Sequence, residues 1–530
     1  MYAKHFIPPP STLAVELQFD FHLSHNSDYP VVIHPLGDGT LKTYTYSDIV
    51  PAIHRCASFF LSSISVDQGT TPIVAFSTTS DALTYSVVLL GVLRAGMTAF
   101  PISPRFSPDI IAHLISVVKP SHILVNTERL PLINQIIALS KYRPEVLQMP
   151  EYSTIFSEGP YSIPETHSRP MDTTALIIHS SGSTSLYPKT IEWSSAFYLT
   201  NAQTVDLAPM HLAGQLVGLQ SLEPFHSLGL CFLNWLAHAG FVMALLDPGD
   251  SASLIPAGPD IIFNNLKQTS PSVIYASAYL LEVWSEDPNK RDFLKSTVVI
   301  TAGRVLNKSC AKKLLDSNVQ LTSGYGSTES GSISIISSLG AQDWDYFCPC
   351  LPEVKFIQRN DGLYSMTVVS TPSRKLPVCN TMYNGIPGYD MGDLFREHAV
   401  KKDYFSVVGR SGDQIMLSTG EMVDPTVIES MLCQMPQVDN AMMIGNGRPS
   451  VGIIIQVAHG FDIEQREVIW DHIWQMIKAA YQGNTTLTKL STEMIIFTNW
   501  QKPIPQATKG MPMRVLALEQ FETEIHSLYK

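Results

Sequence analysis

The order of the secondary-structure signals constrains the fold of this chain more than any other feature. Residues 73–78 (IVAFST) form a short apolar run, residues 82–95 show helical periodicity that ends near Gly96, and residues 97–103 (MTAFPIS) form a second apolar run. Comparable strand signals recur at residues 174–179, 271–275, 297–301 and 318–322. This alternation predicts mainly parallel sheets covered by helices.

Two later regions show different patterns. Within residues 343–408, short strand-like runs are separated by Asp-Gly, Asn-Gly and Pro-Gly turns, which predicts an antiparallel or barrel-like part. After Gly409 a smaller alternation of strands and helices predicts a separate lobe. We therefore expect an α/β fold with a large N-terminal lobe at 1–410, including the β-barrel-like part, and a small, mobile α+β C-terminal lobe at 411–530.

Composition excludes some classes of function. The chain has 530 residues, 45% of them hydrophobic, and a formal net charge of −12. That length and composition can bury a large core, so we expect an ordered protein. The acidic balance, without a basic stretch, argues against nucleic acid or an anionic membrane as a partner. The seven cysteines do not provide the two close pairs that a zinc site would use.

The strongest candidate for a membrane span is residues 229–246. This stretch contains Asn234 and His238 and lacks basic flanks, so a buried helix followed by a strand is the better interpretation. Pro8–Pro10 interrupt the N-terminal region before an apolar run forms, which argues against a secretory signal. We therefore expect a cytoplasmic location and no membrane partner.

Three stretches of small residues follow predicted strands: HSSGSTS at 179–185, TAGR at 301–304 and SGYGSTESG at 323–331. Ligands of parallel sheets bind beyond the carboxyl ends of the strands, which is where these stretches fall. The first one leads to Lys189 and offers backbone N–H groups and hydroxyls to a phosphate. Alone, it fits a phosphate loop and an ordinary Ser/Gly-rich loop equally well, and it lacks the GxxxxGK pattern.

Together with the segments that follow it, this loop resembles the signature of the adenylate-forming superfamily, which includes acyl- and aryl-CoA ligases, luciferases and nonribosomal peptide synthetase adenylation domains. The further matching segments, in order, are VLRAGMTAFPISPR (92–105), PFHSLGL (224–230), TAGR (301–304), GYGSTES (324–330), YDMGDLF (389–395) and VVGRSGDQIMLSTGE (407–421). HSSGST, LSTGEMVDP (417–425) and the closing FETEIHSLYK most resemble the adenylation domain of fungal synthetase-like carboxylic acid reductases.

The resemblance implies that a carboxylate attacks the α-phosphate of ATP, which gives an acyl-adenylate and pyrophosphate. Two anions meet in this step, so backbone donors, a metal ion and cations must offset their repulsion. By resemblance, Thr328 contacts the α-phosphate, Glu329 helps to hold Mg²⁺, and both act in catalysis with Lys509. The implied ATP and AMP contacts are Ser181, Gly182, Ser183, Thr184, Lys189, Gly303, Gly324, Tyr325, Gly326, Thr328, Asp393 and Arg410.

Within that set, the resemblance assigns Thr184 to the β- and γ-phosphates, Asp393 and Arg410 to the ribose, and Tyr325 to the adenine. Each residue also has a purely structural alternative. Glu329 could be a solvated loop acid, Asp393 a turn former and Tyr325 a core aromatic residue. Because the segments occur in the family's order, we favour the functional interpretation.

The pocket segment narrows the substrate class. Residues assigned to the pocket are Phe225, His226, Gly229, Ala302 and Gly326. Members that activate amino acids carry an aspartate after the aromatic residue, where it pairs with the ammonium group, whereas this chain has His226. The resemblance therefore implies a small non-amino carboxylic acid, in particular an aryl acid. The alternative is that His226 is a satisfied core histidine.

The phosphate loop and the C-terminal segment depart from the family pattern. Ser185 stands where glycine is usual, and Tyr187 adds a residue before Lys189, which predicts a looser loop. Met511 stands where the catalytic lysine is usual, and the lysine available nearby is Lys509. Lys509 either reaches the site through a change of backbone path or lies on a surface turn.

The third departure is Gly412, which stands at the hinge where the family often has aspartate or lysine. Glycine absorbs large changes of φ and ψ, so we expect two orientations of the small lobe. The resemblance implies a phosphopantetheine thiol on a carrier (thiolation) domain as the second acceptor and a reductase domain beyond it. No carrier or nicotinamide motif occurs here, so we expect an excised domain. A free-standing acyl- or aryl-CoA ligase and a catalytically impaired nucleotide-binding relative remain as alternatives.

Overall fold

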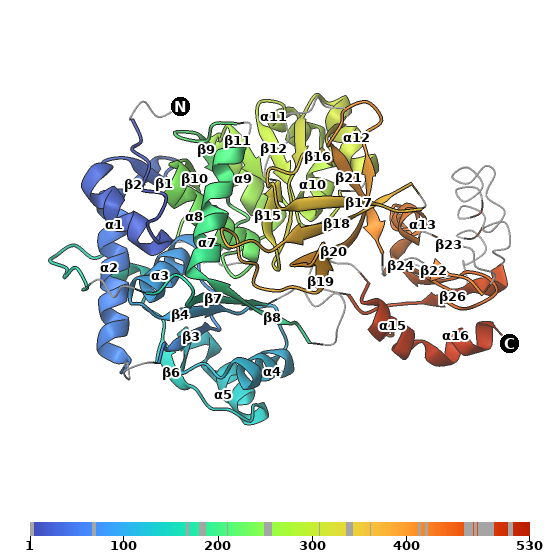
Figure 1. Cartoon of the computed structure of the whole chain (residues 1–530), viewed down its shortest axis with the longest axis horizontal. Helices are drawn as coiled ribbons and strands as arrows, with labels where there is room; N and C mark the ends of the chain where they lie inside the picture. Colours follow the sequence, from blue (N-terminus) through green and yellow to red (C-terminus); the bar gives the residue numbers. More distant parts are fainter. Residues whose placement is uncertain are drawn as a thin grey trace. The chain divides into compact units, whose positions relative to one another are not determined.

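The computed structural model divides the chain into two compact units (Figure 1). One contains Met1–Ser180, Lys189–Met391 and Arg396–Val407, and the other contains Ser181–Pro188, Gly392–Phe395 and Val408–Lys530. The predicted boundary at Arg410 itself stays a prediction. The structure describes residues 5–65, 70–165, 169–179, 187–208, 210–248, 257–306, 308–334, 343–360, 362–411, 415–418, 422–423, 425–459, 470, 474, 492–506 and 512–529.

The first sheet of the large unit has six strands in the order β6-β5-β3-β4-β7-β8. Its strands are β3 (Ile73–Phe76), β4 (Thr98–Pro101), β5 (His122–Val125), β6 (Glu145–Gln148), β7 (Thr174–His179) and β8 (Thr190–Ser194). All neighbours are parallel except β7 and β8, which pair antiparallel. The connecting helices are α3 (Ala82–Arg94), α4 (Pro108–Val118), α5 (Leu130–Leu139) and α6 (Tyr152–Ile155), with the 3₁₀ turn η1 (Thr127–Arg129).

The predicted first strand, helix and second strand are confirmed as β3, α3 and β4. Asp81 caps α3, since its side chain accepts a hydrogen bond of 2.8 Å from the backbone N–H of Thr84. Gly96, with a φ of 76°, ends the helical segment in the left-handed region that favours glycine. Helix and strands therefore form where the sequence signals place them.

The second sheet of the large unit has seven strands in the order β13-β12-β11-β9-β10-β1-β2. Its strands are β1 (Pro30–Pro35), β2 (Leu41–Thr45), β9 (Leu216–Gly218), β10 (Val242–Ala244), β11 (Val273–Tyr275), β12 (Val298–Thr301) and β13 (Gln320–Ser323). Only β1 and β2 pair antiparallel. The helices that accompany it are α8 (Ser227–Ala239), α9 (Pro259–Thr269), α10 (Ala278–Ser285), α11 (Pro288–Leu294) and α12 (Lys308–Asp316).

The apolar stretch at 229–246 forms the buried helix α8 and the strand β10, as predicted. Among the described residues, no helix has the length and apolar character needed to cross a membrane. Four further elements pack beside α3 and α8: α1 (Val15–His25), α2 (Tyr46–Ser63), α7 (Ser195–Gln203) and the 3₁₀ turn η2 (Thr204–Leu207).

An antiparallel sheet follows, as predicted for residues 343–408. Five of its strands run in the order β16-β21-β20-β18-β17, and β19 pairs with β20. They are β16 (Tyr346–Phe347), β17 (Val354–Gln358), β18 (Tyr364–Val369), β19 (Thr381–Tyr383), β20 (Ile386–Glu397) and β21 (Phe405–Arg410). A separate two-stranded hairpin, β14 (Tyr325–Ser327) and β15 (Gly331–Ser334), precedes this sheet in the chain.

The smaller unit has its own sheet, in which β24 (Val438–Ile444) and β25 (Gly452–Val457) pair antiparallel, and β26 (Ile495–Thr498) pairs parallel with β25. Alternate residues point to opposite faces, and each face has an apolar cluster. The other elements of this unit are β22 (Ile415–Met416), β23 (Met422–Val423), α13 (Pro425–Leu432), η7 (Thr492–Met494), α15 (Arg514–Gln520) and α16 (Glu522–Leu528). The α/β fold class is therefore confirmed.

Candidate functional site

The small-residue stretches start at the carboxyl ends of strands, as predicted. His179 is the last residue of β7, Thr301 ends β12, and Ser323 ends β13. Strands β12 and β13 are parallel neighbours in the seven-stranded sheet, whereas β7 belongs to the six-stranded sheet. Both sheets therefore contribute segments to the predicted site, which the sequence alone did not indicate.

The hairpin β14–β15 carries four of the predicted residues. Tyr325 lies at its start, half-buried, with its ring stacked on Phe347 at a centroid distance of 4.8 Å. Gly326 has no room for a side chain, because a Cβ there would overlap the carbonyl oxygen of Gly331. Thr328 and Glu329 occupy the turn between the strands, and both are half-buried. The hairpin thus presents a hydroxyl and a carboxylate next to each other.

Buried groups from three other elements hold this turn by its backbone. Trp193 Nε1 donates a hydrogen bond of 2.8 Å to the carbonyl oxygen of Thr328, and Arg374 Nη2 donates one of 3.0 Å to that of Ser330. Asn201 Oδ1 accepts from the backbone N–H of Ser332 at 3.0 Å. Trp193, Asn201 and Arg374 were missed by sequence reasoning, since nothing local marks them.

The turn also contacts the predicted acid pocket. Thr328 Oγ1 donates a hydrogen bond of 3.2 Å to Ser227 Oγ, in the first residue of α8. His226 is the N-cap of this helix, and Phe225 is fully buried beside it, with its ring centroid 4.7 Å from the imidazole. Gly229 packs so close to Glu223 that a Cβ would overlap the carbonyl oxygen of that residue.

Glu223, which sequence reasoning missed, is the charged partner of His226. The distance between His226 Nε2 and Glu223 Oε2 is 3.2 Å, and Arg105 Nη2 donates to Glu223 Oε1. Burial raises the pKa of Glu223, but the hydrogen bond and charge of His226 and the Arg105 guanidinium outweigh it, so the pKa lies below its usual value. Glu223 is therefore an ionised carboxylate shared by two donors.

The remaining pocket and adenine-side residues follow the ends of the neighbouring strands. Ala302 and Gly303 come directly after β12, and Gly303 has a φ of 86°. Gly324 follows β13, where its backbone N–H donates a hydrogen bond of 2.8 Å to Thr301. Lys189 is exposed just before β8.

Asp393 and Arg410, the predicted ribose contacts, form an ion pair with 3.1 Å between Arg410 Nε and Asp393 Oδ1. The Asp393 side chain is only 13% exposed, whereas that of Arg410 is 44% exposed. Ser411 donates from its N–H and its hydroxyl to the carbonyl oxygen of Gly392, at 2.8 and 3.0 Å. Asp393 is thus held by a partner, which a free turn former would not require.

Six predicted site residues lie outside the described part of the chain: Ser181, Gly182, Ser183, Thr184, Gly412 and Lys509. Within the described part, no group of three or more His, Cys, Asp or Glu could hold a metal ion. Glu329 makes no ion pair with any described residue. One free carboxylate suits Mg²⁺ that takes its other ligands from phosphates and water, so the residues present fit this ion.

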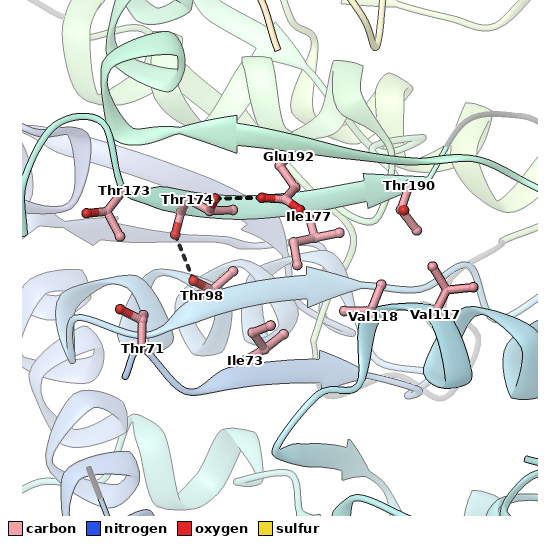
Figure 2. A pocket seen from close by; sticks show the side chains of 10 residues that line it. All are labelled: Thr71, Ile73, Thr98, Val117, Val118, Thr173, Thr174, Ile177, Thr190 and Glu192. Carbon is pink, nitrogen blue, oxygen red and sulfur yellow. Dashed lines mark hydrogen bonds between the residues drawn. The ribbon is translucent and has the colours of Figure 1, made fainter. Parts of the chain in front are cut away.

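A cavity of about 310 Å³ lies beside the six-stranded sheet, and none of the residues that line it is a predicted site residue (Figure 2). Ile73, Thr98 and Thr174, each the first residue of its strand, line it together with Thr190 and Glu192 of β8. Thr98 Oγ1 donates to the carbonyl oxygen of Thr174 at 2.7 Å, and Thr174 Oγ1 donates to Glu192 at 2.9 Å. The lining thus extends from the amino ends of β3, β4 and β7 to Thr190, which pairs with His179 at the carboxyl end of β7.

Solved structures share this architecture over almost the whole chain. ATP-bound MatB from Rhodopseudomonas palustris matches with a TM-score of 0.72 at 18% identity, covering 97% of this chain and 100% of that one. The A-PCP didomain of carboxylic acid reductase from Segniliparus rugosus, in complex with AMP, matches with a TM-score of 0.73 at 14% identity, covering 99% of this chain and 84% of that one. The fold is thus shared with these two proteins.

The sequence gives the family. Residues 19–351 match the AMP-binding enzyme family, and residues 412–530 match the C-terminal domain of AMP-binding enzymes, so the chain belongs to this family. It is 29% identical to adenylate-forming reductase Nps10 from Heterobasidion annosum, over 98% of this chain and 50% of the relative. It is 23% identical to a carboxylic acid reductase from Neurospora crassa, over 92% of this chain and 48% of the relative. The chain spans about half the length of these relatives.

Proposed function

We propose that this chain uses ATP to convert a non-amino carboxylic acid, in particular an aryl acid, to acyl-AMP with release of pyrophosphate. It then transfers the acyl group to the phosphopantetheine thiol of a carrier domain. The observation that carries the first step is the hydrogen bond between Thr328 and Ser227. It joins the turn assigned to the α-phosphate to the helix start that borders the assigned acid pocket, and the two reactants must meet between these groups.

In this mechanism a carboxylate oxygen of the acid forms a bond to the α-phosphorus, and the bond from that phosphorus to the bridging oxygen breaks. The electron pair leaves with pyrophosphate. With ATP bound, the Thr328 hydroxyl donates to an α-phosphate oxygen in place of Ser227 Oγ. The hydrogen bond from Trp193 to the Thr328 carbonyl oxygen sets the position of this residue. Glu329 would hold Mg²⁺, which supplies charge neutralisation to the phosphates when bound.

The other assigned residues orient the two reactants. Asp393 accepts from the ribose hydroxyls beside Arg410, and Tyr325, whose ring stacks on Phe347, packs near the adenine. The phosphate loop at Ser181–Thr184, with Lys189, holds the β- and γ-phosphates. Lys509 bridges the acid and the α-phosphate, and Gly412 serves as the hinge of the small lobe.

The relatives support the second step. They carry the names adenylate-forming reductase and carboxylic acid reductase, and this chain covers about half of their length. We therefore propose that its adenylation chemistry belongs to such an assembly, in which a carrier domain takes the acyl group and a reductase domain reduces the thioester. Transfer to CoA by a free-standing ligase is the second candidate, because the anthranilate CoA ligase AuaEII shares the fold.

The decisive measurement is pyrophosphate release from ATP with a panel of benzoates, other non-amino acids and α-amino acids. We expect release with the non-amino acids and none with the amino acids. Comparable release with amino acids would contradict the substrate class. Nucleotide binding without release, for every acid, would instead identify a catalytically impaired relative.

A second measurement on the same protein distinguishes a carrier-bound phosphopantetheine thiol from free CoA as the acceptor of the acyl group. A phosphopantetheinylated carrier protein and free CoA are supplied in parallel with the best acid, and the thioesters are detected by mass spectrometry. We expect acyl-carrier and little acyl-CoA. The reverse result would assign the chain to the CoA ligases.

A further inference from the structure

A closed circuit of contacts, made by side chains and two backbone N–H groups, links the two sheets of the large unit at the carboxyl ends of their strands. Its members are Ser103, Arg105, His179, Glu223 and His226. Ser103 and Arg105 follow β4, and His179 ends β7, so these three belong to the six-stranded sheet. Glu223 and His226 lie between β9 and α8, on the side of the seven-stranded sheet.

The contact with Ser103 determines the tautomer of His179. The backbone N–H of Ser103 donates to His179 Nε2 at 3.0 Å. Because a backbone N–H can only donate, Nε2 is the acceptor, and this ring is neutral with its hydrogen on Nδ1. The ring of His179 contacts that of His226 edge to face, at a centroid distance of 5.7 Å and an angle of 74°.

The hydrogen bond to Glu223 determines which nitrogen of His226 carries a hydrogen. An ionised Glu223 can only accept, so the Nε2 atom of His226, 3.2 Å away, carries a hydrogen. The other carboxylate oxygen accepts from Arg105, whose backbone N–H in turn lies 3.4 Å from Ser103 Oγ and closes the circuit. The Nδ1 atom of His226 makes no hydrogen bond to any residue that the structure describes. It is therefore the imidazole edge that remains for an acid.

We propose that Glu223 is a specificity-determining residue of the acid pocket, because its charge is already balanced by Arg105 and it orients the imidazole of His226. This inference rests on the proposed function and goes beyond it. The sequence shows only that an aspartate is missing at position 226. The structure adds that the nearest carboxylate does not replace it, since both of its oxygens have donors.

The balance of charges around Glu223 explains why we expect the pocket to prefer acids without an amino group over amino acids. A substrate ammonium brought to this cluster meets the guanidinium of Arg105 and the N–H of His226, and the single negative charge of Glu223 is already neutralised. Charges in a half-buried cluster are screened less than charges in open solvent. The repulsion between the substrate ammonium and the Arg105 guanidinium therefore weakens the binding of amino acids. An acid without an amino group avoids it.

Substitutions of Arg105 and of Glu223 are expected to change the tolerance of the pocket for an ammonium group in opposite directions. Arg105→Gln leaves the Glu223 charge unbalanced, so it makes the pocket more tolerant of an ammonium group. Glu223→Gln removes the anion and keeps one acceptor oxygen in place of the two that Arg105 and His226 use, so it makes the pocket less tolerant of an ammonium group. A merely structural role would reduce activity on all acids alike and would not change selectivity in two directions.

The experiment compares kcat/KM of pyrophosphate release for matched acids that differ by one ammonium group, such as 3-phenylpropanoate and L-phenylalanine, beside benzoate. We expect Arg105→Gln to narrow the preference for the non-amino acid by about tenfold and Glu223→Gln to widen it. Arg105→Lys, which keeps the charge, is expected to retain the selectivity of the unmodified chain. It also provides a folded variant if Arg105→Gln is unstable.

Lys313→Gln is the matched control, since it removes the cation of a surface ion pair with Glu286, 2.7 Å long, between α12 and α10. It should leave the preference unchanged. Equal selectivity in all variants, or the same direction of change in Arg105→Gln and Glu223→Gln, overturns the inference alone. If the unmodified chain releases pyrophosphate with none of the acids, the proposed function fails and this inference falls with it.

Discussion

Gly331 shows how one side chain, or its absence, shapes the candidate site at the residue scale. It follows the turn that carries Thr328 and Glu329 and has a φ of 73°, a conformation that strains other residues. The side-chain amide of Asn201 fills the space where a Cβ would stand. That amide accepts the N–H of Ser332 and so holds the hairpin.

Gly331→Ala is therefore expected to destabilise the large unit by about 2–4 kcal/mol, from backbone strain plus overlap with Asn201. Chemical denaturation measures the loss. Gly385→Ala is a suitable control, because Gly385 has a similar φ of 80° with open space around it, and it should cost only about 1 kcal/mol. Equal losses in the two variants would show that the Asn201 contact contributes nothing.

At this scale the sequence indicated the residues of the turn and of α8 but not what holds them. Thr328, Glu329 and His226 stand in segments whose order is informative. Arg105 and Glu223 are 118 positions apart in the chain and meet only because two sheets bring their strand ends together. A pattern of neighbouring residues therefore cannot predict the ion pair between Arg105 and Glu223.

At the scale of elements, the contact between α1 and α8 includes a buried histidine. His22 Nε2 donates to the carbonyl oxygen of Ala237 at 2.6 Å, and Nδ1 accepts from Asn26 at 2.9 Å. Ala237 lies in the last turn of α8, where carbonyl groups have no partner within the helix. Burial lowers the pKa of His22 to about 4, although the bond to Ala237 opposes this.

This contact predicts a loss of stability in acid. Between the ordinary pKa of 6.5 and the folded value of about 4, the unfolded chain binds a proton that the folded chain excludes. The contribution of His22 is therefore complete above pH 6.5 and decreases as the pH falls to about 4. Urea denaturation at pH 7 and pH 4.5 should show a loss about 2 kcal/mol smaller in His22→Gln than in the unmodified chain. An equal loss in both would contradict the assignment.

Sequence patterns predicted some elements and missed others for physical reasons. β7, α3 and the helix and strand at 229–246 are apolar enough to be found from periodicity. α1 was missed because Glu16, Gln18 and His22 lie on its buried side, so it has no apolar stripe. The strand β9 was missed because it has only three residues, which is too short for an alternating pattern to appear.

At the scale of the whole molecule, each compact unit has an apolar core of its own. In the smaller unit one cluster packs between α13 and the sheet, and the other packs between the sheet and α15 and α16. The sequence predicted this lobe because its strand and helix alternation restarts after an antiparallel region. It did not predict how the strands of the large unit divide between its two mainly parallel sheets.

Because each compact unit has its own apolar core, we expect each unit to unfold locally without the other. Ile453→Ala removes a fully buried side chain from the smaller unit and should cost about 2–5 kcal/mol there. Hydrogen exchange should then rise in β24–β26 and stay unchanged in β3–β5. The same substitution at Ile123, fully buried in β5, should give the opposite pattern. Faster exchange throughout the chain in either variant would mean that the units unfold as one.

The circuit from Ser103 to Glu223 has one more consequence. Because each sheet supplies part of it, the distance and angle between the sheets determine where the imidazole stands. A shift of one sheet by the width of a methyl group would move the pocket wall without altering any residue that touches the acid. If the proposed function holds, acid preference depends on the packing between the two sheets as well as on the pocket residues. New specificities would then arise from substitutions that a comparison of pocket residues alone does not reveal.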